Sequence, residues 1–493
     1  LAALWKVFGR SVAAAHAFSI VCTVAASWLA WRWFRRIEPR GVADALVVAL
    51  AVNWTWGAVG GSIQSEGLYL FLSMTAVNLA RVRGWRASLA LGTVLGLCVL
   101  TRHVGVGLLG AVVIDRLWFH CSAPHPGPPP PGGKGPQRPG RRESEPSPLV
   151  GEGRAGGGHR KSLRDTAVIV FTAGIVVSPW IYWLATVRRN TQVALLDAAG
   201  FVPRVASQAI FYVRRMPDAL TGPFVEVATV FSRSRTVGIA ATSIAVVVSA
   251  VIVIGLICCA IDPRRRLAGL VPLVTLPLLL AWPFTEAGRF LVPLVPFLLV
   301  GAVEGLAWLL GLALRAERTQ ACKKRAASCG NVRQFDRECR PKSPNPTAAN
   351  ASQQGRRMNP RRLAAGLVLL VAIPYPAYAI LTHRAEAQRR SHADFDAACT
   401  WIAREAKHPG PVLTRHPGEV FWQTGRLVVS PESDDVATLV RQIQDQHIAY
   451  ILVDSDRFAN APPTPLARMV TELPGASRLV FAGPVAVYEA VAY

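Results

Sequence analysis

About ten apolar segments, each near the length that crosses a lipid bilayer, constrain the fold of this 493-residue chain more than any other feature. A helix needs roughly 20 mostly apolar residues to cross the hydrocarbon. The chain therefore has the pattern of an α-helical polytopic membrane protein with about ten spans. The predicted spans are 11–31, 42–60, 66–82, 87–102, 103–119, 164–187, 237–260, 267–284, 289–314 and 363–382.

The basic residues lie in short runs between the apolar segments, although the formal net charge of +24 is high enough to suit nucleic acid. Because these runs do not form one basic face, they indicate membrane topology and exclude a nucleic-acid partner. The positive-inside rule predicts a protein of the cytoplasmic (inner) membrane whose C-terminal part lies outside. More than half of the 54 Lys and Arg residues fall in five loops on the predicted cytoplasmic side: 32–41, 81–86, 116–164, 264–266 and 315–362.

The composition divides the chain into a membrane domain at 1–383 and a small soluble α/β domain at 384–493, on the outer (periplasmic) side. Within the first domain, 120–163 and 315–362 are predicted to be disordered basic cytoplasmic loops, since they hold too little apolar surface to fold. Helices are expected near 391–406 and 433–446. The expected strands are 412–414, 427–429, 450–453, 479–481 and 485–488. The nine cysteines have no zinc-site spacing and are predicted to be incidental.

Ionisable residues remain at a few segment ends, where a charge in the hydrocarbon costs on the order of 3 kcal/mol and needs a reason. Ser65 and Glu66 open the segment that follows a glycine-rich turn on the outer side. One interpretation is a capping acid, since the positive end of a helix dipole stabilises a carboxylate. The other is a polar group that faces a water-filled cavity and binds a metal ion, a sugar hydroxyl or a basic partner.

Arg102 lies where two short apolar segments meet near the outer interface. An arginine there either extends its charge to the lipid headgroups or clamps a phosphate, and the sequence leaves both open. The neighbouring His103 is expected to be a hydrogen-bonded interface residue rather than a metal ligand.

Glu286 and Arg289 lie in a short outer turn beside a segment with prolines at 293 and 296. Prolines free backbone carbonyls in a membrane helix, which is tolerated where a cavity is lined. Arg289 is a candidate to hold a lipid phosphate, and the alternative is an exposed pair with Glu286 that contributes little.

Two further regions carry weaker signals. The outer loop at 188–235 alternates arginines with aromatic residues, which indicates an amphipathic interfacial helix or an access route for a lipid-linked anion. In the soluble domain, Asp454 ends a predicted strand, and no neighbour in the sequence completes a metal or nucleophile set.

Three stretches together resemble the membrane-embedded glycosyltransferases of the GT-C type, such as the dolichyl-phosphate-mannose mannosyltransferases and their bacterial relatives. The resemblance lies in their order, spacing and topology, and it covers roughly residues 1–315. The stretches are 65–69 (SEGLY), 96–102 (GLCVLTR) and 288–296 (GRFLVPLVP).

The resemblance implies inverting transfer of a hexose or pentose from a polyprenyl-phosphate donor to a lipid, glycan or protein acceptor on the outer face. By motif position, Glu66 would be an accessory acid near the donor or a divalent metal, while Arg102 and Arg289 would steady the leaving phosphate. The family places its general base in the first outer loop. Since the segment from Trp5 to Trp31 resembles the family's second span, that loop is expected before Leu1.

Two hypotheses from other classes remain open. A transporter of a lipid-linked or anionic solute predicts internal repeats and broken helices around a site at the membrane midplane. An inactive membrane scaffold predicts that Glu66, Arg102 and Arg289 only pair with one another or extend to the headgroups.

Overall fold

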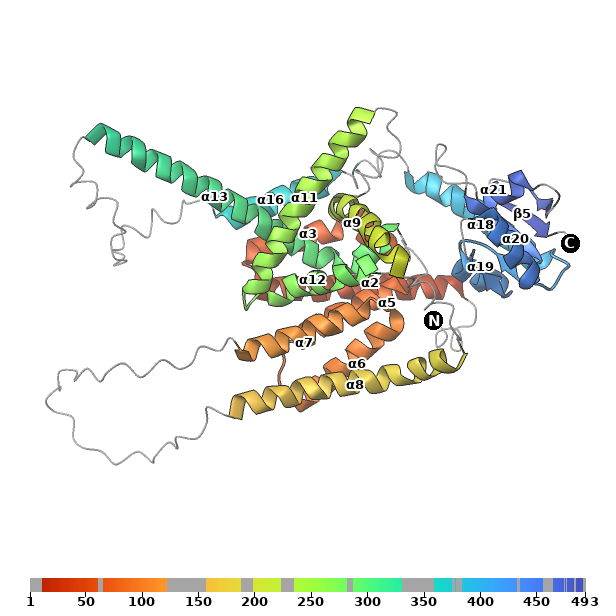
Figure 1. Ribbon diagram of the computed structural model, residues 1–493, viewed down its shortest axis with the longest axis horizontal. Coiled ribbons are helices and arrows are strands. Elements are labelled where there is room, and N and C mark those ends of the chain that lie inside the picture. The colour runs from red at the N-terminus through yellow and green to blue at the C-terminus, as the bar shows by residue number, and fades with distance from the viewer. Residues whose placement is uncertain are drawn as a thin grey trace.

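A computed structural model describes residues 11–60, 65–121, 157–187, 198–222, 235–281, 287–329, 359–374, 377, 384–431, 435–454, 464–473, 475, 477–482 and 485–490. Helices dominate the first part of the chain, and a small sheet lies near the C-terminus (Figure 1). The helices of the first part are α2 (Val12–Ile37), α3 (Arg40–Ala51), α4 (Trp54–Gly60), α5 (Glu66–Leu79), α6 (Trp85–Thr101), α7 (Gly105–Cys121), α8 (Gly157–Val187), α9 (Ala198–Thr221), α11 (Arg235–Ile261), α12 (Arg266–Ala281), the 3₁₀ helix η2 (Ala287–Leu294), α13 (Val295–Cys329) and α16 (Pro360–Ala372).

Every predicted apolar segment coincides with one or two of these helices, which confirms a helical membrane protein. Within the described ranges, four helices are long and apolar enough to cross a membrane by themselves: Ala13–Ile37, Leu163–Tyr182, Thr236–Ile261 and Arg289–Glu317. Helices α6 and α12 are apolar but shorter.

The second predicted span is broken at Asn53, between α3 and α4. The buried Asn53 side chain accepts a hydrogen bond from the backbone N–H of Trp56 at 2.8 Å and so caps α4. Its amide also donates to the carbonyls of Ala219 and Leu220 at the end of α9, at 2.9 and 3.0 Å. One polar side chain therefore satisfies the break and ties α9 into the bundle.

Helix α9 forms much of the outer loop at 188–235, for which the sequence predicted an amphipathic helix at the membrane interface or an access route for a lipid-linked anion. Its first half is largely exposed, whereas Tyr212, Met216 and Leu220 in its second half are buried. Ser249 of α11 donates a hydrogen bond to the Val213 carbonyl at 2.7 Å. The second half of α9 is thus part of the bundle.

Helices α11 and α13 cross in close contact because glycines face each other. A Cβ atom at Gly255 would lie 1.8 Å from the Gly301 carbonyl oxygen, and one at Gly305 would lie 2.0 Å from the Val251 carbonyl oxygen. Glycines spaced four apart let membrane helices approach closely, and van der Waals packing then stabilises the pair. Any side chain at these positions would separate the helices.

Helix α13 extends beyond its predicted end. Residues 315–329, which we expected to belong to a disordered loop, continue the helix. The physical reason is their content of Ala, Arg, Lys, Glu and Gln, which are good helix formers. The rest of that predicted loop up to Asn359, and most of 120–163, lie outside the described residues.

The C-terminal part is a five-stranded sheet with helices on both faces. The strand order is β2-β1-β3-β5-β4; the first three strands are parallel and the last two pairings are antiparallel. All five predicted strands and both predicted helices are present, whereas α19 and α21 were not predicted. The elements are α18 (Arg384–Arg404), β1 (Val412–Leu413), α19 (Pro417–Thr424), β2 (Val428–Val429), α20 (Val436–Asp445), β3 (Tyr450–Asp454), α21 (Pro465–Glu472), β4 (Ser477–Phe481) and β5 (Val485–Ala490).

Alternate residues of the central strand β3 enter two separate cores. Tyr450 and Leu452 pack with Phe395 of α18 on one face of the sheet. Ile451 and Val453 pack with the helices α20 and α21 on the other face. A strand buried on both faces requires a continuous apolar run, which is why the sequence of β3 has no polar residue before Asp454.

Candidate functional site

The candidate site is built around the carboxylate of Glu66, the first residue of α5. Its side chain is fully buried, and Ser65 before it makes no capping hydrogen bond with its own hydroxyl. Gly67 lets α5 lie against α2, since a Cβ at this position would be 2.9 Å from Ser19 Oγ. Helices α2 and α5 are therefore in close contact at the residue next to Glu66.

Arg102 reaches Glu66 from the end of α6. Its backbone N–H caps that helix by donating to the Cys98 carbonyl, and its Nη2 donates to Glu66 Oε1. The Arg102 side chain is only 10% exposed, and its guanidinium carbon lies 5.7 Å from the centroid of the Phe290 ring. Of the two interpretations of Arg102, extension to the headgroups is therefore wrong, because the side chain turns inward to a buried acid.

Arg289 reaches the same oxygen from η2, more than 200 residues further along the chain. Its Nε and Nη2 lie 2.9 and 2.6 Å from Glu66 Oε1. Phe290 beside it is buried and fixes η2 against the bundle. The Arg289 side chain keeps 44% of its surface exposed, so this guanidinium is the accessible edge of the cluster.

The cluster of Glu66, Arg102 and Arg289 carries one formal negative charge and two positive charges. Burying ions is costly unless each is paired and hydrogen-bonded. Two buried atoms, Glu66 Oε2 and Arg102 Nη1, have no hydrogen-bond partner in the described part of the chain. The buried Arg102 Nη1 donor and the two arginines set against one carboxylate suit an anion with several oxygens, such as a phosphate or a carboxylate.

The other predicted site residues have different outcomes. The His103 ring packs against Trp180 with centroids 5.0 Å apart. Glu286 lies outside the described residues, so its predicted pairing with Arg289 stays a prediction. No group of three or more His, Cys, Asp or Glu side chains suited to a metal ion occurs in the described ranges, and two arginines at Glu66 Oε1 disfavour a cation there.

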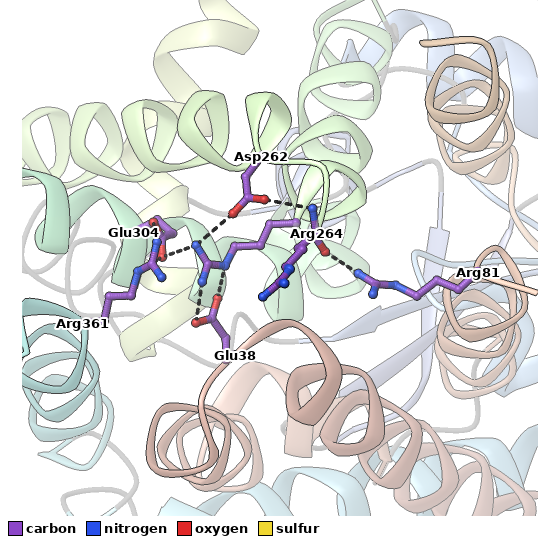
Figure 2. Close-up of polar contacts among 7 residues, drawn as sticks. Glu38, Arg81, Asp262, Arg264, Glu304 and Arg361 are labelled. Atoms are coloured by element: carbon purple, nitrogen blue, oxygen red, sulfur yellow. Dashed lines mark hydrogen bonds and ion pairs between the residues drawn. The ribbon is translucent and has the colours of Figure 1, made fainter. Parts of the chain in front are cut away.

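A second cluster, at the other end of α2, was not predicted. Figure 2 shows Glu38, Asp262, Glu304 and Arg361 converging from α2, α13, α16 and the turn between α11 and α12. Arg265 joins them: its Nε lies 2.6 Å from Glu38 Oε1 and its Nη1 lies 3.0 Å from Glu304 Oε1.

Within this second cluster, Arg361 also pairs with Glu304: its Nη2 donates to Oε2 at 3.3 Å, and its Nε lies 2.8 Å from Oε1. Burial raises the pKa of Glu38 to about 7, and the charge of Arg265 limits that rise. One residue of the sequence could have revealed this cluster. Glu304 is a single acid inside an apolar span, and such an acid indicates a polar contact within the membrane.

In the soluble part, Asp454 has a partner that the sequence analysis missed. The parallel strands β1 and β3 end at the same edge of the sheet, and His416 Nε2 lies 2.9 Å from Asp454 Oδ2 there. Burial opposes ionisation, but the hydrogen bond and charge of His416 hold the pKa of Asp454 below its ordinary value. His416 lies 38 residues before Asp454, so no local sequence pattern indicates that the two side chains meet.

No protein-family model matches the chain, and no curated protein matches its sequence. Among solved structures, ArnT from Cupriavidus metallidurans, bound to undecaprenyl phosphate, is similar with a TM-score of 0.46 and 13% identity, over 99% of this chain and 86% of ArnT. The archaeal oligosaccharyltransferase AglB from Archaeoglobus fulgidus, in complex with an inhibitory peptide and a dolichol-phosphate, is similar with a TM-score of 0.37 and 11% identity, over 90% of this chain and 58% of AglB. At these TM-scores neither adds an argument about the reaction.

Proposed function

We propose that this chain transfers a sugar from a polyprenyl-phosphate-linked donor to an acceptor at the outer end of its helix bundle, with inversion. The observation that carries the proposal is the convergence of Arg102 and Arg289 on the single buried oxygen Oε1 of Glu66. These three side chains place two arginines beside one carboxylate, and the buried Arg102 Nη1 has no hydrogen-bond partner in the described part of the chain.

In this reaction the bond between the sugar C1 and the phosphate oxygen breaks, and the departing polyprenyl phosphate gains negative charge. Arg289, the accessible member of the cluster, meets the phosphate first, and Arg102 Nη1 supplies a second donor from below. In a low-dielectric cleft, such fixed donors stabilise the charge that develops in the transition state. Glu66 orients both guanidiniums, which is the role we assign to it.

The acceptor hydroxyl attacks C1 from the opposite face, and its proton passes to a general base. We assign that base to none of the described residues. The C-terminal α/β domain would then lie on the outer side of the inner membrane, beside the acceptor. The acceptor class, lipid, glycan or protein, stays open.

The test uses the full chain in lipid nanodiscs, a panel of radiolabelled undecaprenyl-phosphate sugars, and wild type beside two variants. Arg289→Gln removes a guanidinium from Glu66 but keeps an amide, and it is expected to lower sugar release about 100-fold. Arg86→Gln is the matched control, since this exposed arginine lies at the opposite end of α6 from Arg102.

Loss of transfer in Arg289→Gln with normal transfer in Arg86→Gln supports the proposal. Equal transfer in wild type and Arg289→Gln would contradict the role of the cluster. Absence of transfer from every donor in the panel would favour the transporter or scaffold hypothesis instead.

A further inference from the structure

A cavity of about 460 Å³ opens at the other end of the bundle from Glu66, beside the cluster of Glu38, Arg265, Glu304 and Arg361. Its walls come from α11, α13 and the start of α16. A volume of this size is within the usual range for small-ligand pockets. The sugar transfer proposed above does not involve this cavity.

One wall of the cavity is apolar and faces outward. Trp308 and Leu312 lie one turn apart on α13, and their side chains are 45% and 43% exposed. In a helix that spans the membrane, these side chains contact lipid, and tryptophan is enriched at the level of the headgroups. The cavity therefore opens toward the lipid phase near the membrane surface.

The other wall is basic. Arg361 binds Glu304 but keeps 37% of its side chain exposed, and Glu304 is already shared with Arg265. Arg315, one turn beyond Leu312, is exposed, and its guanidinium forms no hydrogen bond or ion pair with the described residues. Asn359, which caps α16, completes this wall. Among the residues that line the cavity, two arginines, Arg315 and Arg361, therefore lie beside one acid, Glu304.

We propose that this cavity binds the headgroup of an anionic membrane phospholipid. Its phosphate lies between Arg315 and Arg361, and its acyl chains lie along Trp308 and Leu312. Charge alone would admit any small anion, but a cavity with one basic wall and one lipid-facing apolar wall matches an amphiphile. The positive-inside rule predicts that this end faces the cytoplasm, where anionic lipids attract arginines.

The experiment measures lipid binding to the purified, delipidated full chain by native mass spectrometry. The probe is a short-chain phosphatidylglycerol, compared with the phosphatidylcholine of the same chain length and with inorganic phosphate. Arg315→Gln is expected to weaken phosphatidylglycerol binding about fivefold, the factor that one arginine contributes at an anionic surface. Since Arg315 is exposed, this variant keeps the fold.

Arg362→Gln is the matched control, because it removes the same charge from the residue next to Arg361, which is exposed and does not line the cavity. Weaker binding in Arg315→Gln alone, with phosphatidylcholine bound poorly, supports the site. Equal weakening in Arg315→Gln and Arg362→Gln would reduce the effect to general surface attraction and overturn it. Full competition by inorganic phosphate would identify a simple anion site and overturn the lipid assignment.

Discussion

The two buried ionic clusters of the membrane bundle are built from acids and arginines, and they differ in the number of carboxylates that each sets against its two arginines. They lie at opposite ends of α2, since the run from Ser19 beside Gly67 to Glu38 spans roughly 28 Å at helical rise. Around Glu66, one carboxylate oxygen receives two arginines. Around Arg265, two glutamates and two arginines alternate, and Asp262 adds a further contact at 3.3 Å.

This difference in charge distinguishes the Glu66 cluster, a candidate ligand site, from the Arg265 cluster, which holds helices together. The Arg265 cluster joins three helices and a turn, and each of its two arginines and three carboxylates lies beside an opposite charge within the protein. The Glu66 cluster instead sets one carboxylate against two arginines, and the Arg289 side chain remains 44% exposed. An accessible arginine can meet a ligand, whereas the buried Arg265 acts within the fold.

The largest effect is expected for Arg265→Ala. Removing this residue leaves Glu38 and Glu304 buried without their shared cation, and breaking a buried pair costs about 3 to 5 kcal/mol. The free energy of unfolding, measured by denaturation in mixed micelles, should fall by about that amount. A loss below about 1 kcal/mol would show that this cluster is not a clamp.

Arg102→Ala is expected to have the opposite profile. Glu66 keeps its bond to Arg289, so unfolding should change less than in Arg265→Ala, whereas sugar transfer should fall about 100-fold. The two quantities are compared in the same preparations by a melting curve and a transfer assay. Parallel losses of stability in both variants would erase the distinction between the clusters.

His416→Gln extends the comparison to an ion pair outside the membrane. Asp454 has a lowered pKa, so the stability it contributes is present above the ordinary carboxyl pKa of about 3.9 and is lost as pH falls through the lower folded value. The variant should lose about 1 kcal/mol at pH 7 and show a shallower decline between pH 5 and pH 2. Hydrogen exchange of the β3 amides in the full chain measures the local stability at each pH. The same dependence of stability on pH in wild type and variant would contradict the prediction.

The smallest effect is expected for Asp44→Asn. Arg35 and Asp44 pair at 3.1 Å near the Arg265 cluster, but their side chains are 33% and 53% exposed. Water screens such a pair, so the free energy of unfolding should change by less than about 0.5 kcal/mol. A larger change would mean that exposure does not account for the difference among these ion pairs.

The sequence predicted the helices, the strands and the three residues of the Glu66 cluster, because apolar periodicity and rare charges are local signals. Pairing of Glu66 with Arg102 and Arg289 was expected only under the scaffold hypothesis, and the convergence of both arginines on one oxygen depends on how distant segments pack. Arg265 was not predicted as a buried partner for a similar reason. It lies in a run of three arginines that the sequence analysis used only to assign topology, and only the fold distinguishes it from Arg264. The break at Asn53 depends on the carbonyls of α9, which no local pattern reveals.

The most direct test of the central claim, that the Glu66 cluster binds a phosphate-bearing lipid, is the affinity of the full chain for undecaprenyl phosphate. Native mass spectrometry measures it in wild type, Arg102→Ala, Arg289→Ala and the exposed control Arg35→Gln. We expect a loss of about tenfold or more in each of the first two variants and none in the control. Equal affinities in all four proteins would contradict the claim and leave the cluster as a second structural clamp.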